Sequence, residues 1–553
     1  MNNPPPTDGE KVRPLRFGVD DADQPLVAYT RHAKGAAIFR DLGFDCYVCH
    51  AIPRLSGAKG VFSTLEPGSE EGVSRIRDVK KHVREIDAWC AGSGIAWLAS
   101  LEDANYLPSW KDETGRDWYN HPEGRHFFRM PEEILEEMQS SKSLLGCMYD
   151  EAEHQQISNA FEVGGSRTFL YDYSGDALVD AADHFVAAAR GYADYYRRYG
   201  LNLYTEQILP ILVHSFARAG WTPGVKVLRE HWAPAYLAIA MGSAIQYGTE
   251  LWVSPDLWWT YGHKEKAKRY AVLPGHSPET YHSSMLLAYH LGADCIFSEN
   301  LAHDCEGKGV GCLVSLEGET GYRVTPHGET ARAFIKEYVP GHPRRYSLRE
   351  LKPRVAIIRQ PDTCWGQATS WVPDQLFGNK QWKSSPATTA WLSIWELLSN
   401  GVISKDGLSW HALASYTGRP YQLFCPLDGV VVFDHHVGED RLKGIEVFFL
   451  TGLGVTAKTL EAVGRCVAAG AVCVALPHLA PERVRKSVRG DRTLNDGRGI
   501  WVLTDDFLVP HVRGHIEHVL PAPDTLRYRF GNTTVSFHPA NGDPNRLCVD
   551  TCG

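Results

Sequence analysis

Residues 144–154 read LLGCMYDEAEH, an apolar run that ends abruptly in Asp150 and Glu151 and continues into a second glutamate and a histidine. A buried strand that delivers carboxylates at its C-terminal end is typical of parallel α/β barrels, in which the loops after the strands carry the chemistry. If this interpretation is right, the rest of the chain must supply the other strands of a barrel and a second carboxylate.

Short β-rich runs alternate with helical stretches from residue 16 to residue 300, as expected of repeated βα units around a parallel sheet. With residues 144–151 as the fourth strand, the others are expected at residues 17–19, 45–50, 95–100, 201–205, 225–228, 250–254 and 293–298. Helical spacing is clearest at residues 176–199, 277–292 and 325–339. Eight strands predict a closed (β/α)8 TIM barrel.

Beyond the eighth strand, residues 301–323 are rich in glycine and predict a lid over the barrel mouth, and residues 340–354 predict a linker. A second, flavodoxin-like α/β unit is expected from four strands at residues 355–358, 429–433, 445–450 and 471–475 with a helix at 456–469. Residues 451–454, TGLG, have an incomplete glycine fingerprint and are interpreted as a tight turn. We expect a barrel over residues 1–345, the α/β domain over 346–512 and a small β appendage over 513–553.

Composition narrows the class of protein. The 553 residues are 43% hydrophobic and 22% charged with a net charge of -9, which gives no basic surface for nucleic acid. The N-terminus has charges and prolines where a signal peptide needs an apolar run, and no segment resembles a membrane span, so we expect a cytoplasmic protein. The 13 cysteines predict buried thiols, and Cys46 to His50, which match haem-attachment spacing, are interpreted as part of a strand.

The ends of barrel strands lie near one another whatever their separation in sequence, so acids at those ends form one group. These acids are Asp20, Asp21, Glu102, Asp150, Glu151, Glu206, Glu230, Asp256 and Glu299. Like charges that are buried together raise some pKa values and leave other groups ionised, which yields the acid and the base that glycosidic cleavage requires. Individually, many of these acids could be solvated loop residues. Taken together, the set indicates a catalytic site.

Aromatic and imidazole side chains accompany the acids, and sugar rings suit flat aromatic walls beside polar groups. The expected substrate-binding residues are Asp20, His50, Tyr149, Asp150, Glu206, His231, Trp232, Asp256, Trp258, Trp259 and Asn300. Alternation in the fourth strand puts Tyr149 and Glu151 on one face and Asp150 on the other, without showing which face is the interior. Glu151 is favoured as general acid or acid/base, and Glu230 or Glu299 as nucleophile or base.

In architecture the chain resembles TIM-barrel glycoside hydrolases, and in domain order the family 42 β-galactosidases. Residues 296–300, IFSEN, are similar to the strand ending that carries the nucleophile in that clan. The clan places an Asn-Glu pair on strand four, where this chain has Asp150 and Glu151, and the nucleophile on strand seven, whereas Glu299 counts to strand eight. The resemblance implies a flavodoxin-like domain used in assembly, and hence a homo-oligomer, a dimer or trimer.

The leading hypothesis is a cytoplasmic glycoside hydrolase that acts on a small glycoside or oligosaccharide, without cofactor or metal. One alternative is a metal-dependent barrel lyase, isomerase or hydrolase with ligands from Asp20, His50, Glu102, Glu206 and His231. Another is a non-catalytic sugar-binding protein. In the second domain, the run Asp434, His435 and His436 is as compatible with a solvated loop as with a site.

Overall fold

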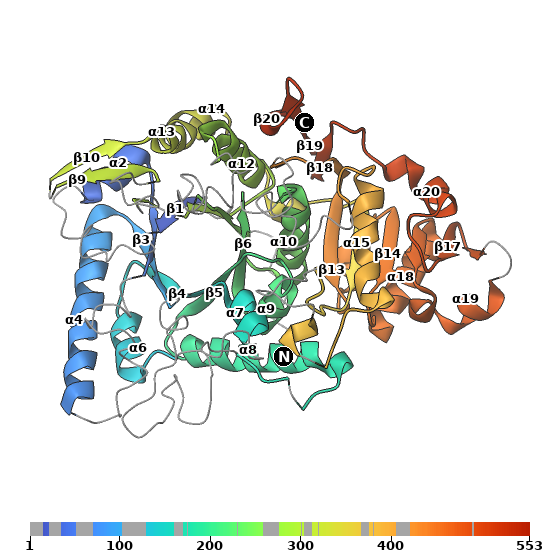
Figure 1. Ribbon diagram of the computed structural model, residues 1–553, viewed down its shortest axis with the longest axis horizontal. Helices are drawn as coiled ribbons and strands as arrows, with labels where there is room; N and C mark the ends of the chain where they lie inside the picture. The colour runs from blue at the N-terminus through green and yellow to red at the C-terminus, as the bar shows by residue number, and fades with distance from the viewer. Residues whose placement is uncertain are drawn as a thin grey trace.

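The structure is a computed structural model. It describes residues 15–20, 35–50, 70–101, 129–159, 170–173, 175–228, 231–257, 276–299, 301–302, 312–318, 320–365, 375–379, 381–404, 421–488 and 492–553. Figure 1 shows three parts: a barrel, an α/β sheet with helices on its faces, and a C-terminal β-sheet close to both.

The barrel is closed by parallel strands that pair in chain order, with β1 also paired to β8. Its strands are β1 (Arg16–Asp20), β2 (Cys46–Cys49), β3 (Ala96–Ser100), β4 (Leu144–Asp150), β5 (Asn202–Gln207), β6 (Thr222–Val227), β7 (Trp252–Pro255) and β8 (Cys295–Ser298). Each expected strand is present, so the predicted (β/α)8 barrel and its strand count are confirmed.

Side chains alternate between the inside of the barrel and the layer of helices around it. The interior cluster consists of Cys46, Val48, Leu98, Met148, Tyr204, Trp252, Cys295 and Phe297. Gly146 lets β4 approach β5, since a Cβ there would lie 2.1 Å from the carbonyl oxygen of Asn202. The face of β4 that carries Met148 and Asp150 is therefore the interior face.

Helices surround the barrel (Figure 1). They are α2 (Gly35–Leu42), α4 (Glu70–Ser93), α6 (Glu132–Gln139), α7 (Ala152–Asn159), α8 (Leu178–Arg197), α9 (Val213–Ala219), α10 (Ala233–Tyr247), α12 (Pro278–His290), α13 (Pro326–Ala333) and α14 (Val339–Gly341), with a π-helical turn at Phe334–Tyr338. Ser277 and Thr325 cap α12 and α13 by accepting hydrogen bonds from backbone amides of the first turn. The three predicted helices are confirmed.

The segment predicted as a lid is partly regular. Strands β9 (Val314–Glu317) and β10 (Gly321–Val324) form an antiparallel hairpin, and the Tyr322 hydroxyl donates to Asp41 on α2 at 3.2 Å. Residues 303–311 lie outside the described residues. The described part is therefore a hairpin fixed beside α2, and the expectation of a segment without regular structure is wrong there.

The segment predicted as a linker is packed onto the barrel. Arg344 donates to the backbone oxygens of Tyr289 and Ala293, at 2.7 and 2.9 Å, and Tyr346 and Leu348 are buried. A short 3-10 helix, Leu348–Glu350, follows. These contacts fix the start of the second sheet relative to the barrel.

The second sheet has the order β13-β11-β14-β15-β17-β16, in which the order of the first four strands is that of doubly wound folds. Its strands are β11 (Val355–Arg359), β13 (Val430–Asp434), β14 (Val447–Thr451), β15 (Val472–Ala475), β16 (Thr493–Asp496) and β17 (Gly499–Leu503). The helices are α15 (Pro386–Leu398), α17 (Glu439–Leu442), α18 (Ala457–Ala469), α19 (Glu482–Ser487) and α20 (Pro510–Ile516). The four predicted strands and the helix at 456–469 are confirmed, whereas β16 and β17 escaped the sequence analysis.

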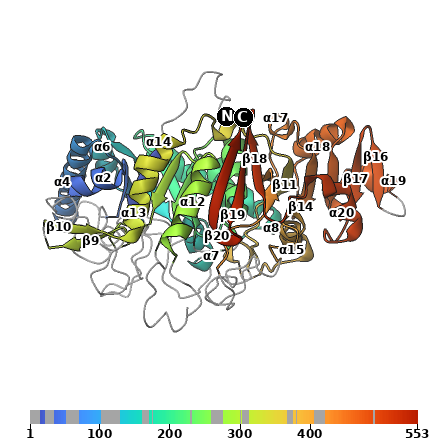
Figure 2. The ribbon, with the colours of Figure 1, turned by 90° about the horizontal axis from the view of Figure 1, so that it is seen from above.

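The C-terminal sheet has the order β12-β18-β19-β20, from β12 (Leu427–Asp428), β18 (Leu526–Phe530), β19 (Thr533–Ala540) and β20 (Asp543–Cys552). Figure 2 shows it in front of α12, and the Leu547 amide donates to the Ser283 hydroxyl of α12 at 3.0 Å. Because β12 comes from the preceding domain, this sheet joins the α/β domain to the barrel.

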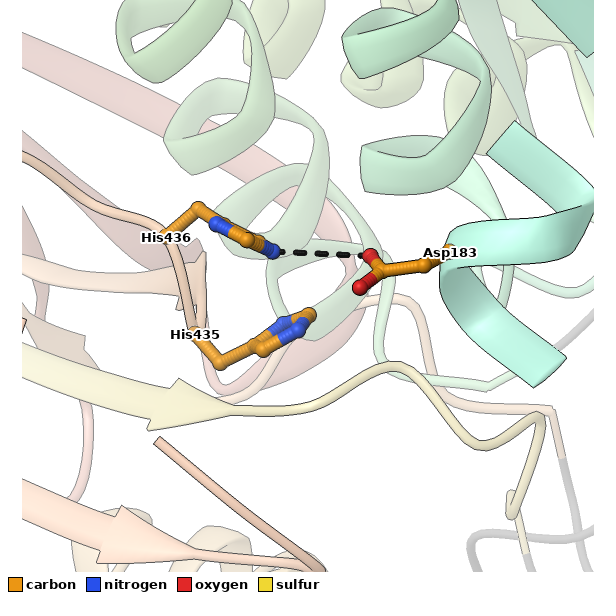
Figure 3. A group of neighbouring side chains, drawn as sticks. All are labelled: Asp183, His435 and His436. Atoms are coloured by element: carbon orange, nitrogen blue, oxygen red, sulfur yellow. Dashed lines mark ion pairs between the residues drawn. The ribbon is translucent and has the colours of Figure 1, made fainter. Parts of the chain in front are cut away.

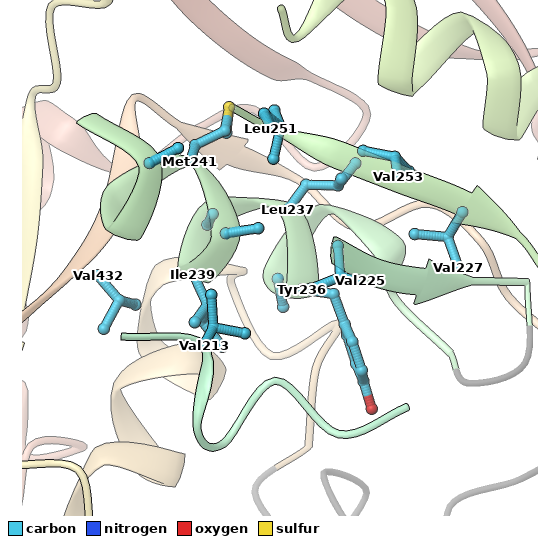
Figure 4. Packing of buried hydrophobic residues seen from close by; sticks show 14 of the residues in the cluster. Val213, Val225, Val227, Tyr236, Leu237, Ile239, Met241, Leu251, Val253 and Val432 are labelled. Atoms are coloured by element: carbon cyan, nitrogen blue, oxygen red, sulfur yellow. The ribbon is translucent and has the colours of Figure 1, made fainter. Parts of the chain in front are cut away.

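Helix α10 lies between the barrel and the second sheet (Figure 4). Twelve of its residues, from Ala233 to Ala244, are buried. One side of the helix packs on Val225, Val253 and their neighbours in β6 and β7, and another side on Val432 of β13. The two parts therefore share one apolar core.

Cysteines in the described part of the chain are free, and most are buried. Cys46 points into the barrel and Cys49 into the outer layer, so the two thiols of the Cys46 to His50 run lie on opposite faces of β2. Among the described residues, no helix combines the length and the apolar character that a membrane crossing requires.

Candidate active site at the C-terminal end of the barrel

The turn after β4 directs two consecutive acids to one place. Glu151 has a φ of +48°, a left-handed conformation that is strained for a residue with a side chain. Its amide donates to the Glu206 carbonyl oxygen at 2.9 Å, and its own carbonyl accepts from Gln155 in the first turn of α7. Because the chain turns at Glu151, both Asp150 and Glu151 reach the same buried ammonium group.

That ammonium belongs to Lys226 on β6, whose side chain is 1% exposed. Its Nζ lies 2.6 Å from Glu299 Oε2 and 3.1 Å from Glu151 Oε1. Asp150 and Glu206 complete the group at 3.7 and 4.0 Å. We refer to Lys226, Asp150, Glu151, Glu206 and Glu299 as the lysine-centred cluster. It joins residues from β4, β5, β6 and β8.

Burial and the mutual repulsion of its acids raise pKa values within the cluster. Burial would lower the pKa of Lys226, but Asp150, Glu206, Glu299 and Glu151 hold that pKa well above its usual range, so the ammonium stays charged. Burial raises the pKa of Glu206 to about 7 against the attraction of Lys226. Burial also raises the pKa of Glu299 well above its usual range, with Asp256, Glu206 and Asp20 adding to the effect. The cluster therefore retains protons near neutral pH.

Three further predicted residues lie beside the cluster. His50 Nε2 is 3.4 Å from Asp20 Oδ2, and both side chains are buried. Asp256 forms an isolated parallel bridge with Glu299, so the ends of β7 and β8 are in register where the acids emerge. Asp20 and Asp256 both act electrostatically on Glu206 and Glu299.

Tyr149 lies elsewhere. Its ring packs against Tyr192, Tyr196 and Trp221, and its hydroxyl pairs with the Tyr196 hydroxyl at 2.8 Å. The side chain is therefore in the layer between β4 and the helices. The prediction that it binds substrate is wrong, because alternation along β4 sends Tyr149 outward when Asp150 points inward.

His231 and Trp232 follow β6 but pack toward the second domain. The His231 Nδ1 accepts from the Gln422 amide at 3.0 Å, and its ring stacks on Tyr421 at 5.5 Å between centroids. The Trp232 amide donates to the Gln422 carbonyl at 2.8 Å. The loop at 421–423 thus extends the wall of the barrel end beside these two residues.

Four predicted site residues, Glu230, Trp258, Trp259 and Asn300, lie outside the described residues, as do Asp21 and Glu102. They stay predictions.

Two buried residues at the candidate site were not among the predicted site residues. Lys226 sits between Val225 and Val227 in an apolar strand, and a lone lysine in a strand of a closed barrel was the signal available. Glu153 is fully buried on α7, and its Oε1 accepts the amides of Ile208 and Leu209 at 2.7 and 3.0 Å. Glu153 therefore fixes the loop after β5 against the turn that carries Glu151.

Comparison with known proteins supports the fold. No protein-family model and no curated protein sequence matches the chain. Among solved structures, it is similar to the cold-adapted β-galactosidase from Rahnella sp. R3, with 12% identity, 96% of this chain and 93% of that chain covered, and a TM-score of 0.51. The chain shares its fold with a β-galactosidase.

A further solved structure is the exo-β-1,4-mannosidase from Opitutaceae bacterium strain TAV5, with 12% identity, 86% and 79% of the two chains covered, and a TM-score of 0.44. The shared fold of the β-galactosidase extends over the barrel, the α/β sheet and the C-terminal sheet. The strand that ends nearest Glu299 is β8, and the acid after β7 is Asp256. The difference in strand number from the family 42 pattern therefore persists in the structure.

Proposed function

We propose that the chain is a glycoside hydrolase whose two essential carboxyl groups are Glu151 and Glu299. The observation that carries the proposal is their shared contact with Lys226. Since one oxygen of each lies 3.1 and 2.6 Å from the same nitrogen, those two oxygens are at most the sum of these distances apart, about 6 Å. A separation of about 5 to 5.5 Å is typical of retaining glycosidases.

We assign the proton of the substrate-free pair to Glu299. Burial and the neighbouring acids raise the pKa of Glu299 well above its usual range although Lys226 opposes the shift, so this carboxyl can donate to a leaving group. Glu151 is the least buried acid of the cluster, with 9% exposure, and Lys226 stabilises its negative charge. This assignment reverses the preference for Glu151 as the acid that the sequence analysis gave.

Substrates with different leaving groups test the assignment. A general acid is dispensable when the leaving group is a weak base, such as dinitrophenolate, and essential when it is an alkoxide. Once a panel of aryl glycosides has given a substrate, Glu299→Gln should lose far more activity on alkyl than on dinitrophenyl glycosides. Glu151→Gln should lose activity on both. The reverse pattern would return the acid role to Glu151.

Asp256→Asn serves as the matched variant. Asp256 follows β7, the strand that carries the nucleophile in the family that the chain resembles, and it adjoins Glu299. We expect this variant to retain at least a tenth of the wild-type kcat/KM. If Asp256→Asn lost nearly all activity while Glu299→Gln stayed active, Asp256 rather than Glu299 would be the partner of Glu151.

A Schiff-base mechanism through Lys226 is a further candidate, since the lysine is buried at the end of a barrel. Such a lysine must lose its proton to attack a carbonyl, and a lowered pKa achieves this. The opposite holds here, because the neighbouring acids Asp150, Glu206, Glu299 and Glu151 hold the pKa of Lys226 well above its usual range. Borohydride treatment with a panel of aldoses and ketoses should therefore leave no adduct on Lys226.

A metal-dependent reaction requires a cation among the acids of the barrel end. The Lys226 ammonium already lies between Asp150, Glu151 and Glu299, where a hard cation would bind. We therefore place the metal-dependent alternative second to the glycosidase. The cytoplasmic location and the homo-oligomer stay predictions of the sequence.

A further inference from the structure

A group of metal-ligating side chains lies where α8 of the barrel meets the turn after β13 of the second sheet. Asp183 comes from α8 of the barrel, and His435 and His436 follow β13 of the second sheet. One potential ligand atom of each lies within 4.8 Å of the others. Figure 3 shows the His436 ring and the Asp183 carboxylate directed at one another, with the His435 ring beside them.

One of the distances is close to that between two ligands of a bound ion. Zinc takes imidazole nitrogen and carboxylate oxygen at about 2.0 to 2.2 Å in a tetrahedron, which separates neighbouring ligand atoms by about 3.4 Å. His436 Nε2 already lies 3.5 Å from Asp183 Oδ1. These two side chains are 38% and 58% exposed, so they are free to close the remaining gap.

His435 supplies an independent sign of a ligand. The residue is 6% exposed, and its Nδ1 is a buried atom without a hydrogen-bond partner among the described residues. When the ring proton of a neutral imidazole is on Nε2, its Nδ1 keeps a lone pair that can bind a metal ion. An imidazole of this kind costs free energy unless something binds it.

The backbone that carries both histidines is fixed. The His436 amide donates to Asp434 Oδ1 at 2.8 Å, and Gln246 of α10 donates to the same oxygen at 2.5 Å. The His435 carbonyl accepts from the Thr459 hydroxyl at 3.0 Å. Asp434 therefore acts as a support, and the rings project from a preorganised turn.

The positive charge of Arg218 lies beside the proposed site and would repel a metal ion. Arg218 of α9 forms an ion pair with Asp183, and the contacts of Arg218 and His436 with Asp183 both use Oδ1. The second carboxylate oxygen, Oδ2, can ligate a metal without displacing Arg218.

We propose that Asp183, His435 and His436 bind a divalent transition-metal ion of the zinc class, with water as the fourth ligand. The ion links α8 of the barrel to the turn after β13 and so fastens the α/β domain to the barrel. Two imidazoles and one carboxylate are ligands of a borderline-soft cation and exclude selectivity for calcium or magnesium. The site is independent of the proposed glycosidase activity.

Calorimetric titration of the full, chelator-treated chain with Zn²⁺ tests the proposal. His436→Ala and Asp183→Asn change exposed side chains and should each lower the affinity of one equivalent at least tenfold. The control is His511→Ala, since the exposed His511 and the half-buried His515 form a histidine pair on α20, with ring centroids 4.7 Å apart, that could bind zinc by itself. His511→Ala should leave that equivalent unchanged.

Two further readouts make the test decisive. Co²⁺ should give the visible absorption of a tetrahedral site in the wild type and not in His436→Ala. Zn²⁺ should raise the unfolding temperature of the wild type more than that of either site variant. No zinc binding up to about 100 µM, or binding unchanged in both His436→Ala and Asp183→Asn, would overturn the proposal.

Discussion

Lys226 brings one positive charge to four carboxyl side chains inside the barrel. Removing one partner of a buried ion pair leaves the opposite charge buried and uncompensated, which costs about 3 to 5 kcal/mol of stability. Lys226→Met keeps the length of the side chain and removes the charge. We expect it to lower the free energy of unfolding by about this amount at pH 7.5.

The decrease in the free energy of unfolding caused by Lys226→Met should be smaller at acidic pH. Without the ammonium, the pKa values of the cluster rise further, so the folded variant binds protons that the unfolded chain releases. Stability of the variant therefore falls as pH rises above about 4.5. Urea denaturation at pH 5 and 7.5 measures this difference, with the exposed Lys443→Met as control. Equal stability of Lys226→Met and wild type at pH 7.5 would contradict the ion-pair account.

Glu153 gives a second pH dependence. Burial raises its pKa to about 8, although the amides of Leu209 and Ile208 oppose the shift. Between its ordinary pKa of about 4.5 and 8, the carboxyl is protonated in the folded protein and ionised in the unfolded chain. Unfolding then releases a proton, so this residue destabilises the protein as pH rises through that window, by at most about 5 kcal/mol.

Glu153→Gln mimics the protonated carboxyl and can still accept both amides. We expect its stability to match that of the wild type at pH 5 and to exceed it at pH 8.5. Thermal unfolding at the two pH values measures the difference. A variant that is less stable than the wild type at both would show that Glu153 is ionised in the folded protein.

At the scale of elements, the packing of α10 on β13 joins the two larger parts. Gly242 allows this approach, because a Cβ there would lie 1.8 Å from the carbonyl oxygen of Val432. Gly242→Ala should therefore force the helix and the strand apart and cost about 3 kcal/mol.

A second helical glycine offers the matched control. Gly464 of α18 has no heavy atom within 4 Å of an added Cβ, so Gly464→Ala should be neutral or stabilise by up to about 1 kcal/mol. Calorimetric unfolding of both variants compares them directly. If Gly242→Ala unfolds like the wild type, α10 and β13 are not in the close contact described.

Elements were predictable where local pattern and burial agree. Each barrel strand is an apolar run bounded by polar residues, and acids such as Glu206 and Glu299 mark its carboxyl end. The hairpin at 314–324 was missed because four-residue strands between glycines carry too little periodicity. The sequence also did not show which face of β4 points into the barrel. Tyr149 and Asp150 lie on opposite faces, and only the closed barrel shows that the face of Asp150 is the interior one.

The candidate site was predictable only in part, because its centre depends on residues that meet only in the fold. Acids at strand ends were recognisable from sequence, and Asp150, Glu151, Glu206 and Glu299 do come together. The contribution of Lys226 required the barrel, since the sequence offers no partner near it. The left-handed turn at Glu151, which aligns two consecutive acids, follows from tertiary contacts.

At the scale of the whole molecule, the end of the barrel is completed by the other domains. Tyr421 and Gln422 reach His231, and β12 joins the α/β domain to the C-terminal sheet, which itself rests on α12. The three parts therefore act as one scaffold for the lysine-centred cluster.

The central claim is that Glu151 and Glu299 cleave a glycosidic bond together. Residues that act as a unit are strongly non-additive, so losing both costs little more than losing one. The most direct measurement is kcat/KM on an alkyl glycoside, whose alkoxide leaving group needs the general acid, for wild type, Glu151→Gln, Glu299→Gln and the double variant. We expect each single variant to lose at least 1,000-fold and the double variant no more than about tenfold further. Turnover within tenfold of the wild type in either single variant would contradict the claim.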